Sequence, residues 1–423
     1  MFKAMSHDGK AVPGRRETVV LLAGLMALNA FAIDSMIPAL PAIGAELGVA
    51  EDNRRQFVVV AYMLGFGVGQ AFWGPLADRF GRKPILAIGV ALYSGFALLC
   101  GVASSFDLLI AGRVAMGASA AVTRVLVVAM VRDLFEGEAM AKVMSLVFMT
   151  FMLVPVLAPN IGQAILLVGP WRAIFWLLAG YGVVMWLWSF VRLPETLHPE
   201  FRRALDARAI TAAARIAAVD RLSLGYTLAM TAIFGALTAY IASIQQIVFD
   251  TYRAPQLIGL VFAGVAAPMA LASWANSRVV GKYGLRRVGH AGLIGFVAIT
   301  ALHVAVAHVV AEPLWLFAAL MGLTMMAFAF TTSNFATLAM TNMAAIAGTA
   351  SSVQGVAGTI GGALIGLVIG QAFDGTQRPF LIGFAACGLA GLILVLITER
   401  GRLFGGIDPV EGDVIVPQPP TDV

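Results

Sequence analysis

Three ionisable side chains lie deep inside stretches of sequence that are otherwise apolar, and their chemistry is that of proton and charge transfer. Asp34 is the only acid in such a position, and Arg113 and Arg124 are the only bases. In a membrane, ionisable groups at this depth are costly and mark proton relays or substrate paths. A weakly polar cavity favours the protonated form of a carboxylic acid. We therefore predict that Asp34 loads and releases a proton.

The two arginines are expected to share one face of a helix. Arg124 follows Arg113 by 11 residues, and eleven steps of ~100° return to within about 20° of the same direction. Asp34 and Arg113 lie at about the same depth in their stretches, so we predict that they act as a coupling pair whose relative movement changes proton affinity. The alternatives are a buried polar bridge for the arginines and a helix end near Pro38 and Pro41 for Asp34.

A short polar run separates two long apolar stretches at residues 74–84. It holds one acid, Asp78, and three bases. A weaker copy of the same spacing follows about 203 residues later, at residues 277–287, where Gly281 replaces the acid. A basic turn present once in each half indicates a duplicated protein whose halves move against each other.

The composition places the chain in a membrane. Hydrophobic residues make up 60% of it and charged residues 12%, with a mean hydropathy of +0.88, whereas soluble domains are about 25% charged. The formal charge of +5 comes from basic residues in inter-helix turns without aromatic neighbours, which argues against nucleic acid. Residues 1–16 are polar and no cleavage site follows the first apolar run, so the first helix is expected to act as its own insertion signal.

Twelve apolar stretches are long enough to cross ~30 Å of hydrocarbon as helices. They lie at roughly 18–40, 56–77, 84–104, 107–130, 140–166, 171–192, 221–245, 255–277, 287–308, 312–334, 345–370 and 378–398. These stretches predict an all-α membrane protein with two six-helix bundles, 18–192 and 221–398. A polar linker, 193–220, joins the bundles and is expected to contain a helix along the membrane surface. Tails at 1–17 and 399–423 complete the chain.

Lys and Arg residues predict the orientation of these helices, because cytoplasmic loops hold the excess. Of the 28 Lys and Arg residues, two lie inside helix 4 and 21 lie on the tails and even-numbered connections. The other five are Arg54, Arg55, Arg172, Arg253 and Arg378. Both termini are therefore predicted to be cytoplasmic.

Two further groups of residues are candidates for movement and for binding. Pro155 and Pro159 remove ladder donors from helix 5, and Gly162 permits close helix contact, so this segment is either a hinge or a static bend. An apolar cavity with a few polar groups is typical of ligand sites. The predicted substrate cavity contains Asn29, Asp34, Tyr62, Arg124, Tyr240 and Gln245.

Other chemistries have little support. No G-x-x-x-x-G-K-[ST] loop for ATP phosphates occurs. The five histidines form no metal pair with an acid, no serine has a catalytic triad around it, and Cys100 and Cys387 make neither a disulfide framework nor a metal pattern. We predict a protein that is not an enzyme and has no metal or cofactor, with protons as its coupling ion.

These residues resemble the major facilitator superfamily over approximately 18–400. Residues 74–83 match the signature between helices 2 and 3 of that family, and the degraded copy after helix 8 is expected there. Arg113 looks like the basic motif of helix 4 in proton-coupled members. Residues 155–162 are similar to the helix 5 signature of antiporters, although Gln163 replaces its second glycine. Finer matches resemble the bicyclomycin and chloramphenicol resistance branch of drug:proton antiporters, at residues 32–41, 131–135, 169–175 and 347–352.

The resemblance implies a central cavity between the bundles and alternating access to it. It implies that Asp34 is the acid linked to protons and substrate and that Arg113 tunes proton release. It also implies a cytoplasmic latch, which is expected to be asymmetric because Gly281 replaces the acid in the second copy. The latch residues are Gly74, Asp78, Arg79, Gly81 and Arg82.

The predicted function is proton-coupled efflux of small amphipathic or aromatic compounds across a bacterial inner membrane, by a monomer whose partners are a drug-like substrate and the lipid bilayer. Two alternatives stay open. One is a symporter that imports a small metabolite with protons, and the other is a membrane receptor or scaffold without transport.

Overall fold

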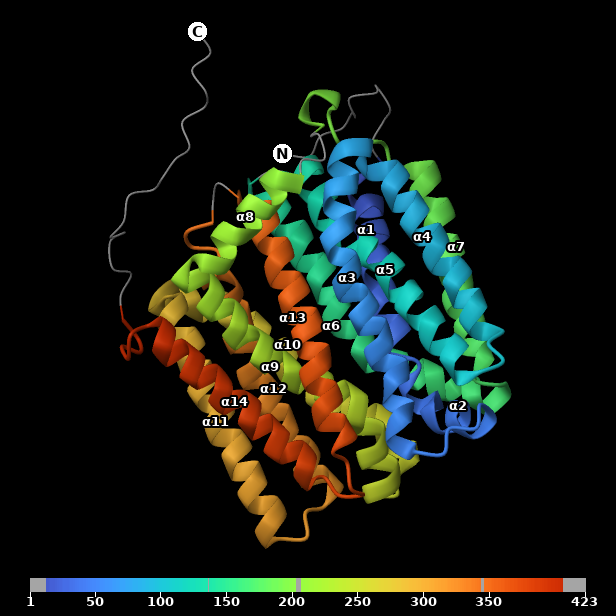
Figure 1. Ribbon diagram of the computed structural model, residues 1–423, viewed down its shortest axis with the longest axis vertical. Coiled ribbons are helices and arrows are strands. Elements are labelled where there is room, and N and C mark those ends of the chain that lie inside the picture. The colour runs from blue at the N-terminus through green and yellow to red at the C-terminus, as the bar shows by residue number, and fades with distance from the viewer. Residues whose placement is uncertain (1–12, 136, 203–206, 344–345, 406–423) are drawn as a thin grey trace.

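The computed structural model describes residues 13–135, 137–202, 207–343 and 346–405, and all regular elements among them are helices (Figure 1). The long helices are α1 Arg15–Asp34, α3 Phe57–Phe80, α4 Arg82–Gly101, α5 Phe106–Leu134, α6 Gly137–Val168 and α7 Arg172–Arg192, then α9 Arg221–Gln246, α10 Ile258–Tyr283, α11 Leu285–Val309, α12 Leu314–Leu338, α13 Ala347–Gln371 and α14 Arg378–Thr398. Short helices are α2 Leu40–Glu46 and α8 Ala207–Val219. In the described residues, 11 helical segments are long and apolar enough to cross a membrane, and α6 adds the shorter apolar stretch Leu157–Val168. The predicted all-α membrane fold is confirmed.

The first membrane helix ends earlier than expected. Instead of one helix over 18–40, α1 ends at Asp34, and a 3₁₀ turn, η1 Ile37–Ala39, leads into α2. Proline lacks the N–H that a helix interior needs, and Pro38 and Pro41 lie instead in the first turns of these two short elements, where proline is tolerated. Asp34 therefore lies at a helix end, where the last carbonyls have no partner within the helix.

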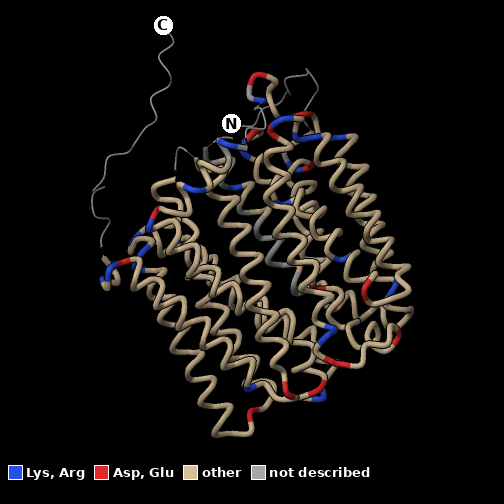
Figure 2. The backbone as a smooth tube through the Cα atoms, viewed as in Figure 1, with Lys and Arg blue, Asp and Glu red and all other residues tan. Residues whose placement is uncertain are grey.

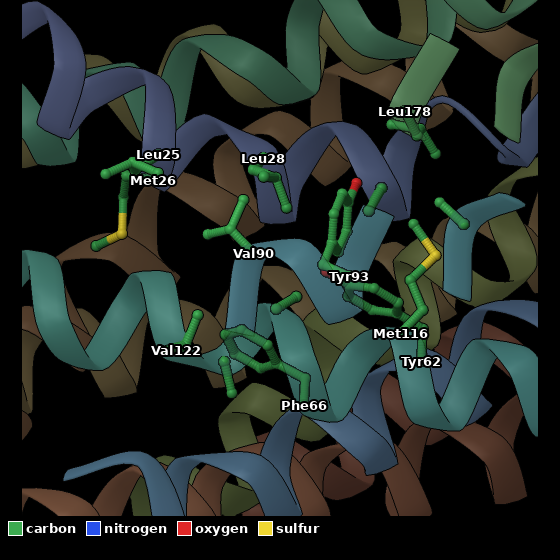
Figure 3. Packing of buried hydrophobic residues seen from close by; sticks show 14 of the residues in the cluster. Leu25, Met26, Leu28, Tyr62, Phe66, Val90, Tyr93, Met116, Val122 and Leu178 are labelled. Atoms are coloured by element: carbon green, nitrogen blue, oxygen red, sulfur yellow. The ribbon is translucent and has the colours of Figure 1, made fainter. Parts of the chain in front are cut away.

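Two hydrophobic cores divide the chain. The first is built from residues between 21 and 193, together with Ala242 and Ala363. Figure 3 shows part of it, where Tyr62, Tyr93 and Met116 lie close together. The second core is built from residues between 226 and 395, together with Ile37 of η1. Each six-helix bundle therefore has a core of its own, and a few residues of each bundle pack into the other.

The bundles meet along two helix pairs. α3 packs against α13, and α6 packs against α10. Gln70 of α3 donates a hydrogen bond to Thr359 of α13 (3.0 Å), and a side chain at Gly355 would meet the Gln70 amide. Small residues on α13 thus bring the two bundles close together.

Charged residues mark the two ends of the molecule. The first residues of α1 and the last residues of α14 lie on the same side of the molecule, which we call the terminal end. Figure 2 shows that Lys and Arg residues gather there. Helix α8, in the segment between the bundles, lies at this end (Figure 1). Its buried Ala217 packs with Met343 and Ala350, while Arg215 is exposed. α8 is therefore amphipathic, and its position along the membrane surface stays a prediction.

Candidate functional site

Asp34 lies where the two bundles meet, as the last residue of α1. Its side chain is 3% exposed, and among the described residues its carboxylate forms no hydrogen bond or ion pair. The hydroxyl of Tyr240, on α9 of the second bundle, lies within electrostatic range of that carboxylate. η1, which follows Asp34, also packs against α9, so Asp34 lies beside a contact between the two bundles.

Arg113 is fully buried in the first bundle and is held by backbone carbonyls. Its Nε donates to the carbonyl of Val58 (2.8 Å) and its Nη1 to the carbonyl of Ala32 (3.0 Å), while the guanidinium lies 4.5 Å from the ring centre of Tyr62. Ala32 is in the last turn of α1, whose unpaired carbonyls attract a cation. Arg113 therefore caps the helix end that carries Asp34, and the two side chains form no ion pair in this structure.

Two of the predicted cavity residues join helices within the first bundle. Tyr62 Oη donates to Asn29 Oδ1 (3.1 Å), and Asn29 Nδ2 donates to Thr123 Oγ1 (2.7 Å). All three side chains are buried and link α3, α1 and α5. Buried polar groups are normally satisfied in this way, so Asn29 and Tyr62 have a structural task here, and their contact with a substrate stays a prediction.

The other predicted cavity residues have polar atoms without a partner. The hydroxyl of Tyr240 and the amide of Gln245 are buried on α9 and form no hydrogen bond with the described residues. Arg124, half-buried on α5, likewise has no hydrogen bond or ion pair in the described part of the chain. Unsatisfied buried polar groups cost free energy, and this set is therefore the one best suited to contact a substrate or a proton carrier.

The predicted latch lies at the terminal end and is bound to its own bundle. Arg82 Nη1 pairs with Asp78 Oδ1 (2.5 Å), and Arg82 Nε lies 3.4 Å from Asp133 Oδ2 at the end of α5. Glu195, just after α7, accepts from the backbone N–H groups of Arg82 (2.8 Å) and Lys83 (3.2 Å). None of these partners belongs to the second bundle, and no hydrogen bond or ion pair joins Asp78 or Arg82 to the second bundle in the described residues.

The remaining latch residues have distinct surroundings. Gly81 has φ = 105°, a backbone conformation that only glycine adopts without strain, and it forms the sharp turn between α3 and α4. Arg79 is exposed and lies over the ring of Phe80 (5.3 Å). Gly74 is half-buried on α3, and a side chain there would meet only Val125.

The predicted hinge in α6 borders the end of α1. The side chain of Pro155 lies outside the described residues, whereas Pro159 and Gly162 are buried. A side chain at Gly162 would collide with the backbone carbonyl of Ser35, the residue after Asp34. On the same helix, Gln163 Nε2 donates to the carbonyl of Pro255 in the second bundle (3.3 Å). α6 thus touches both the Asp34 turn and the other bundle.

A cluster of amide side chains, Asn53, Gln56 and Gln246, joins the two bundles at the end of the molecule that lies opposite the terminal end. We call this cluster the amide seal, and the sequence did not predict it. Gln246 Nε2 donates to Asn53 Oδ1 (2.9 Å), and Gln56 donates to the side chain of Gln246 and to the carbonyl of Gly370 (3.0 Å for the latter). Asn53 Nδ2 also donates to the carbonyl of Gln371 (3.1 Å). These bonds join the bundles across some 190 to 320 residues of sequence. The described hydrogen bonds at the terminal end include none that joins the bundles.

Asp133 and Glu195 were also missed as latch partners. The only available signal was an acid at the end of a helix or just beyond one, on the same side as the basic run. The sequence gives even less indication of the amide seal, because Asn53 and Gln56 lie in or beside a segment whose composition is that of an ordinary polar loop.

Comparisons with known proteins agree with this geometry. Residues 22–366 match the model of the Major Facilitator Superfamily. The chain is 30% identical over 382 residues to the bicyclomycin resistance protein homolog of Haemophilus influenzae, covering 87% of this chain and 92% of that protein. It is 34% identical over 172 residues to the multidrug resistance protein MdtL of Escherichia coli, covering 41% and 44% of the two chains. The xylose transporter XylE from E. coli, in a partially occluded inward open conformation, has the same fold, with a TM-score of 0.69 at 13% identity over 91% of this chain and 97% of that one.

Proposed function

Because this chain belongs to the major facilitator superfamily, we propose that it is a proton-coupled antiporter that exports small amphipathic or aromatic compounds. The names of its relatives, which refer to bicyclomycin and multidrug resistance, support a drug-like substrate. The family and fold are those of a transporter rather than an enzyme. Protons serve as the coupling ion, no resident cofactor takes part, and the protein acts as a monomer.

The observation that carries the proposal is the buried carboxylate of Asp34 at the junction of the bundles. An ionised carboxylate without a partner is costly in a membrane interior, and the cost disappears when a proton or a substrate neutralises it. One proton crossing the membrane supplies ~2.3 kcal/mol per 100 mV of potential. Competition of proton and substrate for Asp34, in alternation, would transfer that energy to export.

Sidedness follows from the charge distribution. Cytoplasmic loops hold the excess of Lys and Arg, and these residues gather at the terminal end (Figure 2). We propose a bacterial inner-membrane location with both termini in the cytoplasm. The amide seal would then lie on the outer side, and the structure would correspond to a cytoplasm-facing state in which Asp78 and Arg82 are released from the second bundle.

The test is Asp34→Asn in everted membrane vesicles with bicyclomycin as the first substrate. Respiration acidifies the lumen of such vesicles, and an antiporter then exchanges lumenal protons for the added substrate. We expect substrate-induced alkalinisation of the lumen by the wild type and by Asp107→Asn, which alters an exposed carboxylate of α5. Asp34→Asn should reach the same membrane level and show none.

Each other outcome assigns a different function. Undiminished proton exchange by Asp34→Asn would remove this residue from coupling. Substrate-induced proton movement of the opposite sign would indicate a symporter. A wild type that shows no counterflow above background, for a panel of drug-like compounds, would favour the receptor or scaffold.

A further inference from the structure

A groove of about 550 Å³ lies in the second bundle, away from the candidate site. Helix α11 packs mainly on α12 and α14 and touches α10 little, so a gap remains between α10 and α11. α11 runs along one edge of the molecule (Figure 1). Small residues of α11, Ala291 and Gly295, leave the gap open, and Gly292 of α11 and Ala327 and Phe330 of α12 line it as well.

The groove has the dimensions of one half of a bilayer. Its lining on α11 extends from Arg287, beside the turn at the terminal end, to Ile299, which is about 18 Å at 1.5 Å per residue. Half of the ~30 Å hydrocarbon thickness is ~15 Å. Apart from Arg287, the lining is apolar or carries only the phenol of Tyr283. Its shape and chemistry therefore suit a hydrocarbon chain that enters from one leaflet.

A cation stands at the surface end of the groove. Arg287 is exposed and forms no hydrogen bond or ion pair with the described residues, whereas its neighbour Arg286 is bound to Glu399 (3.0 Å). The exposed ring of Tyr283, the last residue of α10, lies at the same turn, and such rings occupy the headgroup level of membranes. No acid lines the groove, so Arg287 is left without a described counter-charge.

We propose that this groove binds an anionic phospholipid, with one acyl chain between α10 and α11 and the phosphodiester at Arg287. Basic pockets between membrane helices on the cytoplasmic side suit acidic headgroups. A zwitterionic lipid would offer the same hydrocarbon but a weaker charge match. The segment after α14 completes the site, because Phe404 lines the groove and its backbone N–H donates to His290 Nδ1 (3.1 Å).

The test is native mass spectrometry of the purified full chain in detergent with phosphatidylglycerol or phosphatidylcholine of identical acyl chains. The wild type should retain phosphatidylglycerol at least fivefold more than phosphatidylcholine. Arg287→Gln should lose this preference. Gly295→Leu should lose binding of both lipids, because the Cβ at Gly295 has room and meets only Ala327 at 3.9 Å, which leaves the added side chain to fill the groove.

Three further variants test whether a loss of lipid binding comes from the groove itself or from substitution in general. Ala291→Leu, at an exposed lining position, fills the groove independently and should also abolish binding. Arg132→Gln alters an exposed arginine at the terminal end of the first bundle, and Gly180→Leu alters an exposed helical glycine with open space around it. Both should bind as the wild type does.

Three results would overturn the proposal. The first is equal retention of the two lipids by the wild type, and the second is undiminished binding by both groove-filling variants. The third would come from a shortened chain. A chain ending at Gly405 should bind phosphatidylglycerol as the full chain does. If it bound several-fold more, the groove would belong instead to residues 406–423, which include Asp408, Glu411 and Asp413.

Discussion

At the scale of single residues, Arg113 is a buried charge that the fold holds by backbone carbonyls and not by a carboxylate, and its Nη2 has no hydrogen-bond partner among the described residues. Its planar guanidinium reaches the carbonyls of Val58 and Ala32 at the same time, and the face of Tyr62 covers it. This arrangement connects α5 to the end of α1 and so to Asp34. The predicted pair of Asp34 and Arg113 is therefore linked through the backbone of α1 and not by direct contact, and a role in proton release stays a prediction.

Arg113→Lys should destabilise the protein although the charge is kept. The lysine ammonium is a point charge without the fork that spans two carbonyls, so at least one charged hydrogen bond is lost, at a cost of about 1.5–3 kcal/mol. The melting temperature in detergent should fall, and transport should fall at equal membrane level. Arg132→Lys, at an exposed position of the same helix, should match the wild type. An unchanged melting temperature for Arg113→Lys would show that the two carbonyl contacts are not important.

At the scale of elements, the close approach of α6 to the end of α1 is the contact that brings the helix 5 signature to Asp34. Gly162 allows it, because any side chain there would collide with the Ser35 carbonyl. Movement of α6 against the other bundle, through Gln163 and α10, would therefore reach the Asp34 turn directly. The glycine is visible in the sequence, whereas the carbonyl opposite it is not.

Two glycine-to-alanine changes should have opposite effects on stability. Gly162→Ala must shift α6 or the Ser35 turn, and such overpacking costs about 1–3 kcal/mol. Gly180→Ala, at an exposed position of α7 with open space, should stabilise its helix by about 0.5–1 kcal/mol. Thermal unfolding in detergent checks both signs. A melting temperature that does not fall for Gly162→Ala would mean that α6 and α1 are less closely packed than described.

At the scale of the whole molecule, the amide seal joins the two bundles at the end opposite the latch. Asn53, Gln56 and Gln246 are held by several cross-bundle hydrogen bonds, while the latch at the other end is bound only within the first bundle. Under the proposed alternating access, the seal would open when the latch engages. Substitutions in the amide seal or in the latch should therefore change the relative populations of the state closed at the seal and the state closed at the latch.

The double variant Asn53→Ala with Gln56→Ala should shift the protein towards the state open at the seal. Each lost hydrogen bond contributes about 0.5–1.5 kcal/mol net, so the loss of several should change the population ratio by a factor of at least ten. Electron-spin distance measurements between labels at the exposed positions Asp52 and Asp374 should then show a longer component. Asn342→Ala removes a bond to Asp220 (3.0 Å) away from the seal and should leave the distances unchanged. If the double variant and the wild type had the same distribution of label distances, the amide seal would not determine which end of the bundle interface is closed.

The features of this protein that could be predicted are those that depend on local sequence. Apolar length predicted the helices, and the repeated basic turn predicted two related bundles, whereas the orientation drawn from Lys and Arg stays a prediction. Helix boundaries were less accurate where proline acted, since the first helix stops at Asp34 and not at residue 40. Of the candidate site, Asp34 and Arg113 were found because a charge in an apolar stretch is visible without any structure.

The membrane class, the two bundles and the charged residues in apolar stretches can be predicted from the amino-acid sequence, because hydrophobicity and charge belong to each residue wherever it packs. The contacts that those residues make became visible only in the folded chain. The carbonyl of Ala32 lies 81 residues from Arg113, and the amide of Gln246 lies 193 residues from Asn53. Such partners depend on how each helix is rotated and where its neighbours cross it, and many rotations bury the same apolar surface equally well.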